Sequence, residues 1–335
     1  MPPPKSPTIY DVAKQAGVSI TTVSRMLNAP DKVTPETRER ILAAIDSLGF
    51  VPKAEARARA LRQTGRIGVI TPFFTALSFV QRLRGVAAML SRQNYELVIY
   101  PVDSEEQLKG YISSIPVMRN IDGLIIMSLA MQDQDVERLV SNQMETVLIE
   151  FDHEKLSCVV IDDYQGGRMA AEYLLRKGYC SFGFLGDIEP PERYAIHPVR
   201  SRLEGFQSVL QENGLTLSSE TIKSAFYAHE ASRQAAYELL TMPNRPRAIF
   251  AASDIQALSI IKVARQLNVR IPEDVALIGF DDIDMAEYAD LTTIRQHLDE
   301  SGRLAVEILM GRIADPSRPV QHIKLPLTLV ERETA

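Results

Sequence analysis

The chain has 335 residues, of which 45% are hydrophobic and 24% charged, as is typical of a soluble protein with two or three domains. It lacks an apolar run of about 18 residues, which argues against a membrane span, and proline near the N-terminus argues against a signal peptide, so we expect a cytoplasmic protein. The net charge of −6 is uneven: residues 1–66 carry 11 basic and 6 acidic side chains, so only this end is expected to meet a polyanion.

The N-terminal segment predicts three short helices. A helix over 10–16, a turn at Gly17 and a second helix over 20–27 capped by Ser19 have the layout of a helix-turn-helix. In this motif the second helix lies in the DNA major groove. The Thr34-Pro35 pair predicts the start of a third helix that would complete a small core.

From residue 67 onward, short apolar strands alternate with amphipathic helices. The strands are expected at 67–70, 97–100, 123–127, 147–149, 159–161, 182–185, 248–251 and 276–280, with helices such as 80–92, 167–176, 203–211, 233–240 and 257–267 between them. This alternation predicts parallel sheets with helices on both faces. The elements are too many for one sheet, so we expect two lobes with a ligand cleft between them.

The two cysteines, Cys158 and Cys180, lack metal-type spacing and are expected to be buried thiols in a reducing compartment. The five histidines also lack metal-ligand spacing, although His197 precedes an expected cleft segment and could line it. We therefore expect no metal and no cofactor.

A series of motifs occurs in the order and spacing of a known family. They are Ile9-Tyr10-Asp11-Val12-Ala13, Gly17-Val18-Ser19, Thr22-Val23-Ser24-Arg25, Leu48-Gly49-Phe50-Val51-Pro52, Arg202-Leu203-Glu204-Gly205-Phe206, Ser253-Asp254, Ile278-Gly279-Phe280-Asp281-Asp282 and Leu291-Thr292-Thr293-Ile294-Arg295-Gln296. On these motifs the chain resembles the LacI/GalR family of bacterial transcription regulators over nearly its whole length. The resemblance implies a small all-α helix-turn-helix head and a two-lobed α/β body similar to periplasmic sugar-binding proteins, with three crossovers between the lobes.

The resemblance also implies a domain division. The expected parts are a DNA-binding domain at 1–50, a hinge helix and linker at 51–66, and an effector-binding and dimerisation domain at 67–335, with an N-lobe at about 67–162 and 294–322 and a C-lobe at about 163–293 and 323–335.

In the family, three positions of the second helix reach base edges, and here they hold Ile20, Thr21 and Arg25. Arg25 can pair bidentately with guanine, whereas Ile20 offers only apolar contact, for example with a thymine methyl. Other polar residues are candidate phosphate contacts that position the domain without reading sequence, or else ordinary caps and surface groups. They are Thr8, Tyr10, Ser19, Thr22, Ser24, Asn28, Lys32 and Thr34.

The hinge departs from the family pattern. Most members have a Leu seven residues after the Pro, a wedge that kinks a base step in the minor groove, but this chain has Arg59 there. Leu61 could act as the wedge after a register shift, Arg59 could enter a narrow minor groove as a cation, or the segment could be a flexible basic tether. The candidate hinge residues are Lys53, Ala56, Arg57, Arg59 and Leu61.

The resemblance also places an effector site between the lobes. Arg202 matches the family's effector-gripping Arg, Asp281 matches an acceptor of hydroxyl hydrogen bonds, and Ser253 replaces the usual Asn. The remaining candidates are an aromatic platform at Tyr227, a cleft acid at Glu150 and a wall at Phe73 or Phe74. A charged clamp with aromatic faces suits a sugar. Buried Arg202 and Asp281 should be paired, or reached by water, when no ligand is bound. The alternative for these two residues is a purely structural ion pair. The alternative for the remaining candidates is plain packing or an ordinary surface position.

The sequence thus predicts a homodimeric regulator, expected to be a repressor, that binds a pseudo-palindromic operator and responds to a small molecule, expected to be a sugar. A transport-system sugar receptor and an enzyme are the alternatives. Catalysis is not expected, because the chain has neither a P-loop nor a Gly-x-Ser-x-Gly elbow. The adjacent pairs Asp162/Asp163 and Asp281/Asp282 should point to opposite faces if they lie in strands.

Overall fold

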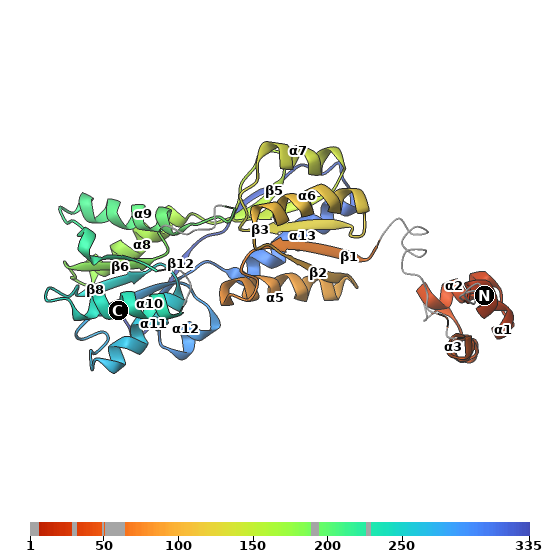
Figure 1. Cartoon of the computed structure of the whole chain (residues 1–335), viewed down its shortest axis with the longest axis horizontal. Coiled ribbons are helices and arrows are strands. Elements are labelled where there is room, and N and C mark those ends of the chain that lie inside the picture. The colour runs from red at the N-terminus through yellow and green to blue at the C-terminus, as the bar shows by residue number, and fades with distance from the viewer. Residues whose placement is uncertain (1–6, 29–31, 49, 51–63, 189–193, 226–228) are drawn as a thin grey trace. The chain divides into compact units, whose positions relative to one another are not determined.

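The computed structural model describes residues 7–28, 32–48, 50, 64–188, 194–225 and 229–335 (Figure 1). The chain divides into two compact units, Met1–Thr64 and Gly65–Ala335, which we call the head and the body. No helix in the described ranges combines the length and apolar character needed to cross a membrane.

The head contains the three expected helices, α1 (Ile9–Ala16), α2 (Ile20–Asn28) and α3 (Pro35–Leu48). Gly17 ends α1 in the left-handed region at φ +63, where glycine is unstrained. The guanidinium of Arg40 on α3 donates a hydrogen bond of 2.6 Å to the Ala16 carbonyl and so ties α3 to this turn. The buried side chains of the head form one cluster of Val12, Ala13, Ala16, Val23, Met26, Val33, Ile41 and Ala44.

The body contains two six-stranded sheets. The first has the order β11-β5-β4-β3-β1-β2, and all its strand pairs are parallel. Its strands are β1 (Arg66–Thr71), β2 (Glu96–Pro101), β3 (Gly123–Met127), β4 (Thr146–Ile149), β5 (Ser157–Val160) and β11 (His322–Lys324). Every residue of β3 and β4 is buried, which explains their unbroken apolar runs.

The second sheet repeats this arrangement in the order β12-β10-β9-β8-β6-β7, with only β12 antiparallel to its neighbour. Its strands are β6 (Phe182–Gly186), β7 (Ile222–Ser224), β8 (Ala248–Ala251), β9 (Ala276–Asp281), β10 (Thr293–Arg295) and β12 (Thr328–Val330). In both sheets the strand order reverses beside the first strand, β1 or β6, and ligands of open α/β sheets bind at such reversal points.

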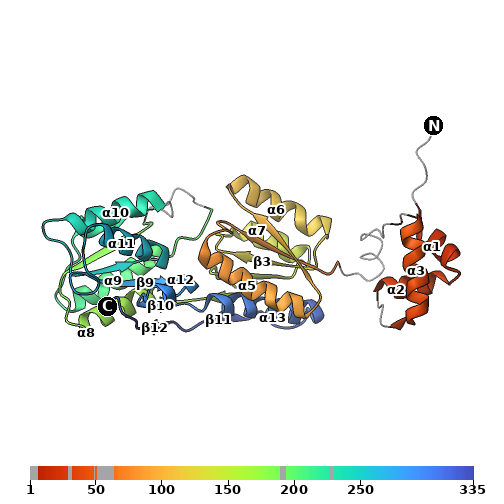
Figure 2. The ribbon, with the colours of Figure 1, turned by 90° about the horizontal axis from the view of Figure 1, so that it is seen from below.

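Helices cover both faces of each sheet. On the first sheet, α5 (Leu77–Arg92) and α13 (Leu298–Ala314) cover one face, and α6 (Glu105–Met118) and α7 (Asp133–Ser141) cover the other (Figure 2). On the second sheet the pairs are α8 (Asp163–Arg176) with α9 (Val199–Glu212), and α10 (His229–Thr241) with α11 (Asp254–Gln266). A short helix, α12 (Asp284–Tyr288), and a 3-10 turn, Ser219–Thr221, complete the described elements.

The chain crosses between the two lobes three times, as the family resemblance implies: after β5, after β10 and after β11. The expected boundary at 293/294 falls inside β10, which belongs wholly to the second sheet. The expected boundary at 322/323 falls inside β11, which belongs wholly to the first sheet. Both crossovers therefore begin a few residues later than the approximate boundaries predicted, because three-residue strands give too short an apolar signal to place.

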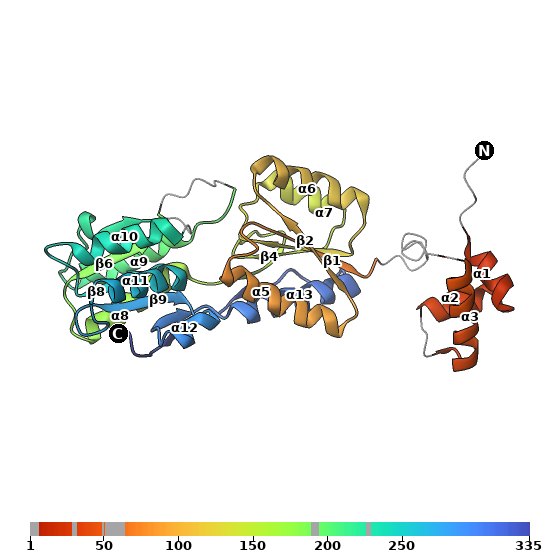
Figure 3. The same ribbon diagram turned by 60° about the horizontal axis from the view of Figure 1, so that its bottom comes forward.

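Paired glycines allow one helix pair in each lobe to pack closely. A Cβ at Gly167 on α8 would lie 1.9 Å from the Arg202 carbonyl oxygen on α9, and one at Gly302 on α13 would lie 2.2 Å from the Arg82 carbonyl oxygen on α5. Figure 3 shows α5 and α13 side by side. In each lobe, the backbone of an arginine therefore packs directly against a glycine on the neighbouring helix.

Candidate ligand cavity and DNA-reading helix

A cavity of about 500 Å³, open mouth included, lies between the two lobes. Its lining residues come from both lobes and from the crossover after β10. They are Phe73, Ser78, Phe79, Arg82, Glu150, Asp187, Ile196, His197, Pro198, Val199, Arg202, Ala252, Ser253, Asp281 and Gln296. Most follow the carboxyl ends of strands, which is where ligands of such sheets bind.

Several strand ends at the cleft have an unusual backbone conformation. Phe73 after β1, Ser128 after β3, Glu150 after β4 and Asp281 at the end of β9 all have positive φ values, of 45°, 54°, 68° and 118°. Non-glycine residues in this region are strained, and such residues concentrate at functional sites. The strain therefore marks the same edge of the sheets that the cavity occupies.

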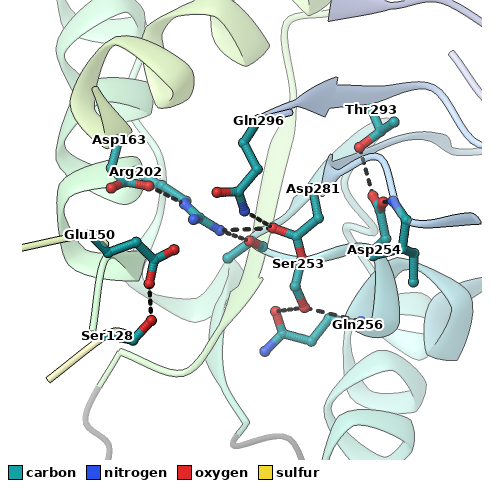
Figure 4. Close-up of polar contacts among 12 residues, drawn as sticks. Ser128, Glu150, Asp163, Arg202, Ser253, Asp254, Gln256, Asp281, Thr293 and Gln296 are labelled. Carbon is teal, nitrogen blue, oxygen red and sulfur yellow. Dashed lines mark hydrogen bonds and ion pairs between the residues drawn. The ribbon is translucent and has the colours of Figure 1, made fainter. Parts of the chain in front are cut away.

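Hydrogen bonds connect the two lobes across the cavity. Arg82 donates from Nη2 to Glu150 and, at 2.7 Å, to the side-chain oxygen of Gln296. Gln296 in turn donates from Nε2 to Asp281, and Ser128 donates to Glu150. Figure 4 shows Gln296 beside Asp281, with Glu150 and Ser128 across the cavity. Gln296 lies on a crossover, so this network joins groups of the first lobe to a carboxylate of the second.

Arg202 is one of two buried arginines of the cavity, with 4% of its side chain exposed. Its Nε donates to Asp163 at 2.8 Å, its Nη1 donates to the Ala252 carbonyl at 2.6 Å, and Asp281 lies 3.8 Å from Nη1 (Figure 4). The guanidinium stacks 3.6 Å from the centre of the Phe280 ring. Burial alone would lower the pKa of Arg202, but the carboxylates of Asp163 and Asp281 raise it above its usual value, so Arg202 stays charged.

Arg202 was expected to pair with Asp281, and this pairing is present only as the longer of two ion pairs. The shorter ion pair is with Asp163, a residue for which no effector role was expected. Burial raises the pKa of Asp163 and raises that of Asp281 to about 6, and Arg202 opposes both shifts. Asp254, buried behind the cavity and bonded to Thr293 Oγ1 at 2.6 Å, also has a raised pKa through burial and through Asp281.

The other candidate effector residues divide into three groups. Phe73 and Glu150 line the cavity, whereas Phe74 is 39% exposed and does not. Ser253 also lines it, but its Oγ caps α11 by accepting from the Gln256 backbone N–H, so its hydroxyl is partly engaged. Tyr227 lies outside the described residues.

Arg82, Asp187 and Gln296, which line the cavity, were not predicted from the sequence, nor was Asp163, which pairs with Arg202. Arg82 carried a signal, because it follows Phe79 by three residues and places a charge on the apolar face of α5. His197 lines the cavity, as its position before the Arg202 segment allowed. Its Nδ1 lies 4.0 Å from Asp187 Oδ2.

One of the two adjacent aspartate pairs departs from the strand-based expectation. Asp162 and Asp163 are not in a strand: Asp162 caps α8 by accepting from a backbone N–H and pairs with Lys324 at 2.8 Å, whereas Asp163 is the first residue of α8. Asp282 pairs with Arg295 and Arg332 away from Asp281. Neither pair brings two carboxylates to one point, as a general acid and base would need.

A second depression of about 790 Å³, open solvent included, also lies between the lobes. Its charged lining is paired within and between the lobes: Arg84 on α5 bonds to Asp299 on α13 of the same lobe and to Asp284 on α12 of the other. Arg84 is about half exposed, and no Phe, Tyr or Trp is among the lining residues identified for this depression. It thus lacks the phenyl rings that Phe73 and Phe79 give the first cavity, and we take that first cavity as the candidate ligand site.

The three candidate base-reading residues share one exposed face of α2. Ile20 is 41% exposed, and Thr21 and Arg25 are also exposed, whereas Val23 is fully buried in the head core. This helical spacing turns the three side chains away from the core, as base contacts require.

The candidate phosphate contacts are more varied. Thr8 is bonded to Asp11 through its N–H and its hydroxyl, and Ser19 Oγ caps α2 by accepting from the Thr22 N–H at 3.1 Å. Tyr10 is 67% exposed, Lys32 and Thr34 are exposed, and Ser24 and Thr22 are half-buried. Asn28 ends α2. The hinge residues Lys53, Ala56, Arg57, Arg59 and Leu61 lie outside the described residues.

Comparison with known proteins agrees with this division. Residues 8–53 match the model of the lacI family of bacterial regulatory proteins, and residues 171–335 match that of the periplasmic binding protein-like domain. The chain is 31% identical to the transcriptional repressor PurR of Photobacterium profundum and 30% identical to the ribose operon repressor of Escherichia coli. The PurR match covers 98% of both chains, and the ribose repressor match covers 98% of this chain and 99% of the relative.

Among solved structures, the lac repressor dimer bound to operator and an anti-inducer is similar, with a TM-score of 0.79 and 25% identity over 98% of this chain and 99% of that one. A helix-turn-helix head joined to a two-lobed binding body defines a ligand-responsive transcription regulator. The chain belongs to the LacI family of bacterial regulatory proteins, and it is a DNA-binding transcriptional regulator of that family.

Proposed function

We propose that the chain is a homodimeric, cytoplasmic transcriptional repressor whose affinity for operator DNA is controlled by a neutral sugar bound in the cavity between the lobes. The observation that carries the choice of ligand is the charge balance of the cavity. Three carboxylates, of Glu150, Asp187 and Asp281, and two guanidinium groups, of Arg82 and Arg202, line it.

This balance disfavours an anionic ligand. Both arginines already bond to carboxylates, so an anion would have to compete with Glu150 and Asp163 for them and would meet Asp281 as well. Sugar hydroxyls both donate and accept, so they can insert between the paired charges without leaving any buried group unsatisfied. The rings of Phe73 and Phe79 add an apolar wall. The ribose operon relative is consistent with a sugar effector.

The same geometry supports a mechanism of control. A ligand that contacts Glu150 and Arg82 in one lobe and Asp281 and Arg202 in the other must fix the angle between the lobes. Gln296 lies on a crossover and bonds to both sides, so its environment changes when the lobes move. By linkage, an effector that weakens DNA binding is itself bound more weakly by the DNA complex.

For the head, we propose that Arg25, Thr21 and Ile20 read bases and that the exposed Tyr10 and Lys32 contact phosphates. Two heads in a dimer would read the two halves of a pseudo-palindromic operator. The similar lac repressor structure is a dimer bound to operator. We retain the division into a DNA-binding domain at 1–50, a hinge at 51–66 and an effector-binding domain at 67–335.

We propose no catalytic activity for the cavity. Asp281 accepts from Gln296, and Glu150 accepts from Arg82 and Ser128, so neither carboxylate is left free to act as a general base. PurR and the ribose operon repressor are both transcriptional repressors. A turnover assay on sugars and sugar phosphates should show no product.

The test combines thermal shift with mobility shift. A panel of neutral sugars, sugar phosphates and nucleobases is screened first, since a ligand at 100 times its dissociation constant adds about 2.7 kcal/mol to stability. Arg202→Ala should abolish the shift given by a neutral sugar without abolishing operator binding. Arg200→Ala, two residues away on the exposed side of α9, is the matched control and should keep the shift.

Two outcomes would overturn the proposal separately. A shift with phosphorylated sugars or nucleobases but with no neutral sugar would reject the ligand class. Absence of preference for any genomic fragment, with and without these ligands, would reject operator binding.

A further inference from the structure

Three side chains with metal-binding atoms meet at the β11 edge of the first sheet. Asp152 lies in the loop after β4, Cys158 is on β5 and His322 is on β11. None of them lines the cavity between the lobes. The Cys158 Sγ lies 3.3 Å from Asp152 Oδ1 and 3.4 Å from His322 Nδ1, and His322 Nδ1 lies 2.7 Å from Asp152 Oδ1.

The fold itself fixes this meeting. Cys158 and His322 are directly paired across the parallel strands β5 and β11, so their side chains project from the same face of the sheet. The backbone N–H of Cys158 donates to the Gln321 carbonyl at 2.8 Å, which fixes the register of the two strands. Cys158 is fully buried, whereas the side chains of His322 and Asp152 are 38% and 62% exposed. The cluster therefore has one buried metal-binding side chain and two that are accessible to solvent.

The spacing of these atoms is close to that of zinc ligands. Tetrahedral Zn²⁺ binds sulfur at about 2.3 Å and nitrogen or oxygen at about 2.0–2.2 Å, so its ligand atoms lie roughly 3.3–3.6 Å from one another. Both distances from Cys158 Sγ already fall at or near this range. Only the hydrogen-bonded pair of His322 and Asp152 must separate, by roughly 0.6 Å, and both side chains are free to do so at the surface.

We propose that Asp152, Cys158 and His322 bind one Zn²⁺ ion, with the fourth position open to solvent. A set of one sulfur, one imidazole nitrogen and one carboxylate oxygen suits Zn²⁺ and not Mg²⁺ or Ca²⁺, which take oxygen ligands. On binding, the Cys158 thiol loses its proton to solvent and the thiolate coordinates the ion. No ligand comes from Cys180 or His153, which lie outside the cluster.

Such an ion would stabilise the edge of the first sheet at β11. In the first sheet β11 pairs with β5 alone, and the chain leaves β11 directly for the crossover to β12. A metal that links β11 to the loop after β4 would therefore restrain one end of a connection between the lobes. Zinc binding should raise the melting temperature of the full chain.

The experiment uses the full chain, reduced and freed of metal, in competition with a chromophoric zinc chelator and in a separate titration with Co²⁺. We expect one ion per chain and a cobalt spectrum with a thiolate-to-metal charge-transfer band. Cys158→Ser should lose that band and weaken zinc binding at least tenfold. Cys180→Ser is the matched control and should leave both unchanged, because Cys180 is the exposed cysteine outside the cluster.

A second pair of variants keeps the test decisive if Cys158→Ser fails to fold. His322→Ala, at an exposed position, should weaken binding at least tenfold, whereas His153→Ala, next to Asp152 in sequence, should not. Absence of stoichiometric zinc binding in the wild-type chain overturns the proposal. So does unchanged affinity in His322→Ala, or a cobalt spectrum of the wild-type chain without a thiolate band.

Discussion

Gln296 accepts a hydrogen bond of 2.7 Å from Arg82, although the two residues are 214 positions apart in the chain. The same glutamine donates to Asp281. It thus satisfies a buried cation of the first lobe and a buried carboxylate of the second from a position on the crossover between them. Removing it should affect both stability and communication.

Gln296→Leu deletes both hydrogen bonds while nearly keeping the side-chain volume. Because Arg82 and Asp281 are buried and would each lose a partner, we expect the free energy of unfolding to fall by about 1–3 kcal/mol. The urea midpoint measures this loss. Gln211→Leu, at an exposed position on α9, should change it little, and an equal loss in both variants would argue against the bridging role.

The close contact of α8 and α9 gives a prediction about Gly167. Its replacement by Ala would place a methyl group 1.9 Å from the Arg202 carbonyl, so the helices must separate and Arg202 must shift. We expect a destabilisation of about 1–3 kcal/mol from overpacking and a weaker ligand shift. Thermal unfolding with and without ligand measures both effects.

Gly110→Ala on α6 is the control for that variant, because no atom lies within 4 Å of the added methyl group. It should stabilise the chain by about 0.4–1 kcal/mol through the unfolded state. If Gly167→Ala were equally well tolerated, the tight packing of α8 on α9 would not be a constraint.

The raised pKa of Asp281 gives a pH dependence of stability. Burial raises this pKa from 3.8 to about 6, against the opposing effects of Arg202, Gln296 and Arg82, so between pH 4 and 6 the native state binds more protons than the unfolded state. Stability from this group is therefore greatest below about pH 4 and falls as the pH rises to about 6. The carboxylates of Glu150 and of the buried Asp254 also interact electrostatically with Asp281.

Asp281→Asn removes that titration. As the pH rises from 4 to 7, the unfolding free energy of the variant relative to that of wild type should increase by up to about 3 kcal/mol, taking 1.36 kcal/mol for each pKa unit. Urea unfolding across this range tests the difference. Asp133→Asn, whose side chain is 99% exposed, should show none, and a parallel pH profile for Asp281→Asn and wild type would refute the assignment.

Arg25 gives a prediction for the head. Arg25→Ala should weaken binding to the preferred operator by about 1–3 kcal/mol and relax the base preference at one position of each half-site, because a bidentate contact to guanine is lost. Selection from a randomised DNA pool measures this preference. Lys14→Ala, exposed on α1, should leave it unchanged, and retained selectivity in Arg25→Ala would exclude a reading role.

The Arg59 position gives a prediction for the hinge. Arg59→Leu should tighten operator binding if the hinge uses an apolar wedge, because the change restores the family pattern. Weaker binding would instead favour a cation in the minor groove. Mobility shift at two salt concentrations separates the cases, since loss of a cationic contact also reduces the salt dependence.

Most of the fold could be predicted from the sequence because its long elements have strong local signals. All eight predicted apolar strands are present, and the helix starts at Thr8 and Ser19 follow from capping residues. The short strands β7, β10, β11 and β12 were not among the predicted strands, because three residues carry no readable period. Cys180 was expected to be buried and is exposed, since a lone cysteine in sequence does not reveal which side of a turn it takes.

The candidate site was predictable where a motif marked it and not elsewhere. Arg202 and Asp281 stand in family motifs and do line the cavity. The partner of Arg202, Asp163, could not be found, because the contact joins residues 39 positions apart on two helices. Gln296 stands at the end of a family motif, but its role depends on the distance between the lobes, which no local pattern encodes.

The three crossings of the chain between the lobes also bear on how the body is made. The first sheet is incomplete without α13 and β11, and the second without β10 and β12, so the final part of the chain supplies elements to both. During synthesis, neither lobe can complete its sheet until residues 293–330 have emerged from the ribosome. The head, whose helices all precede those residues in the chain, can fold before the body is complete.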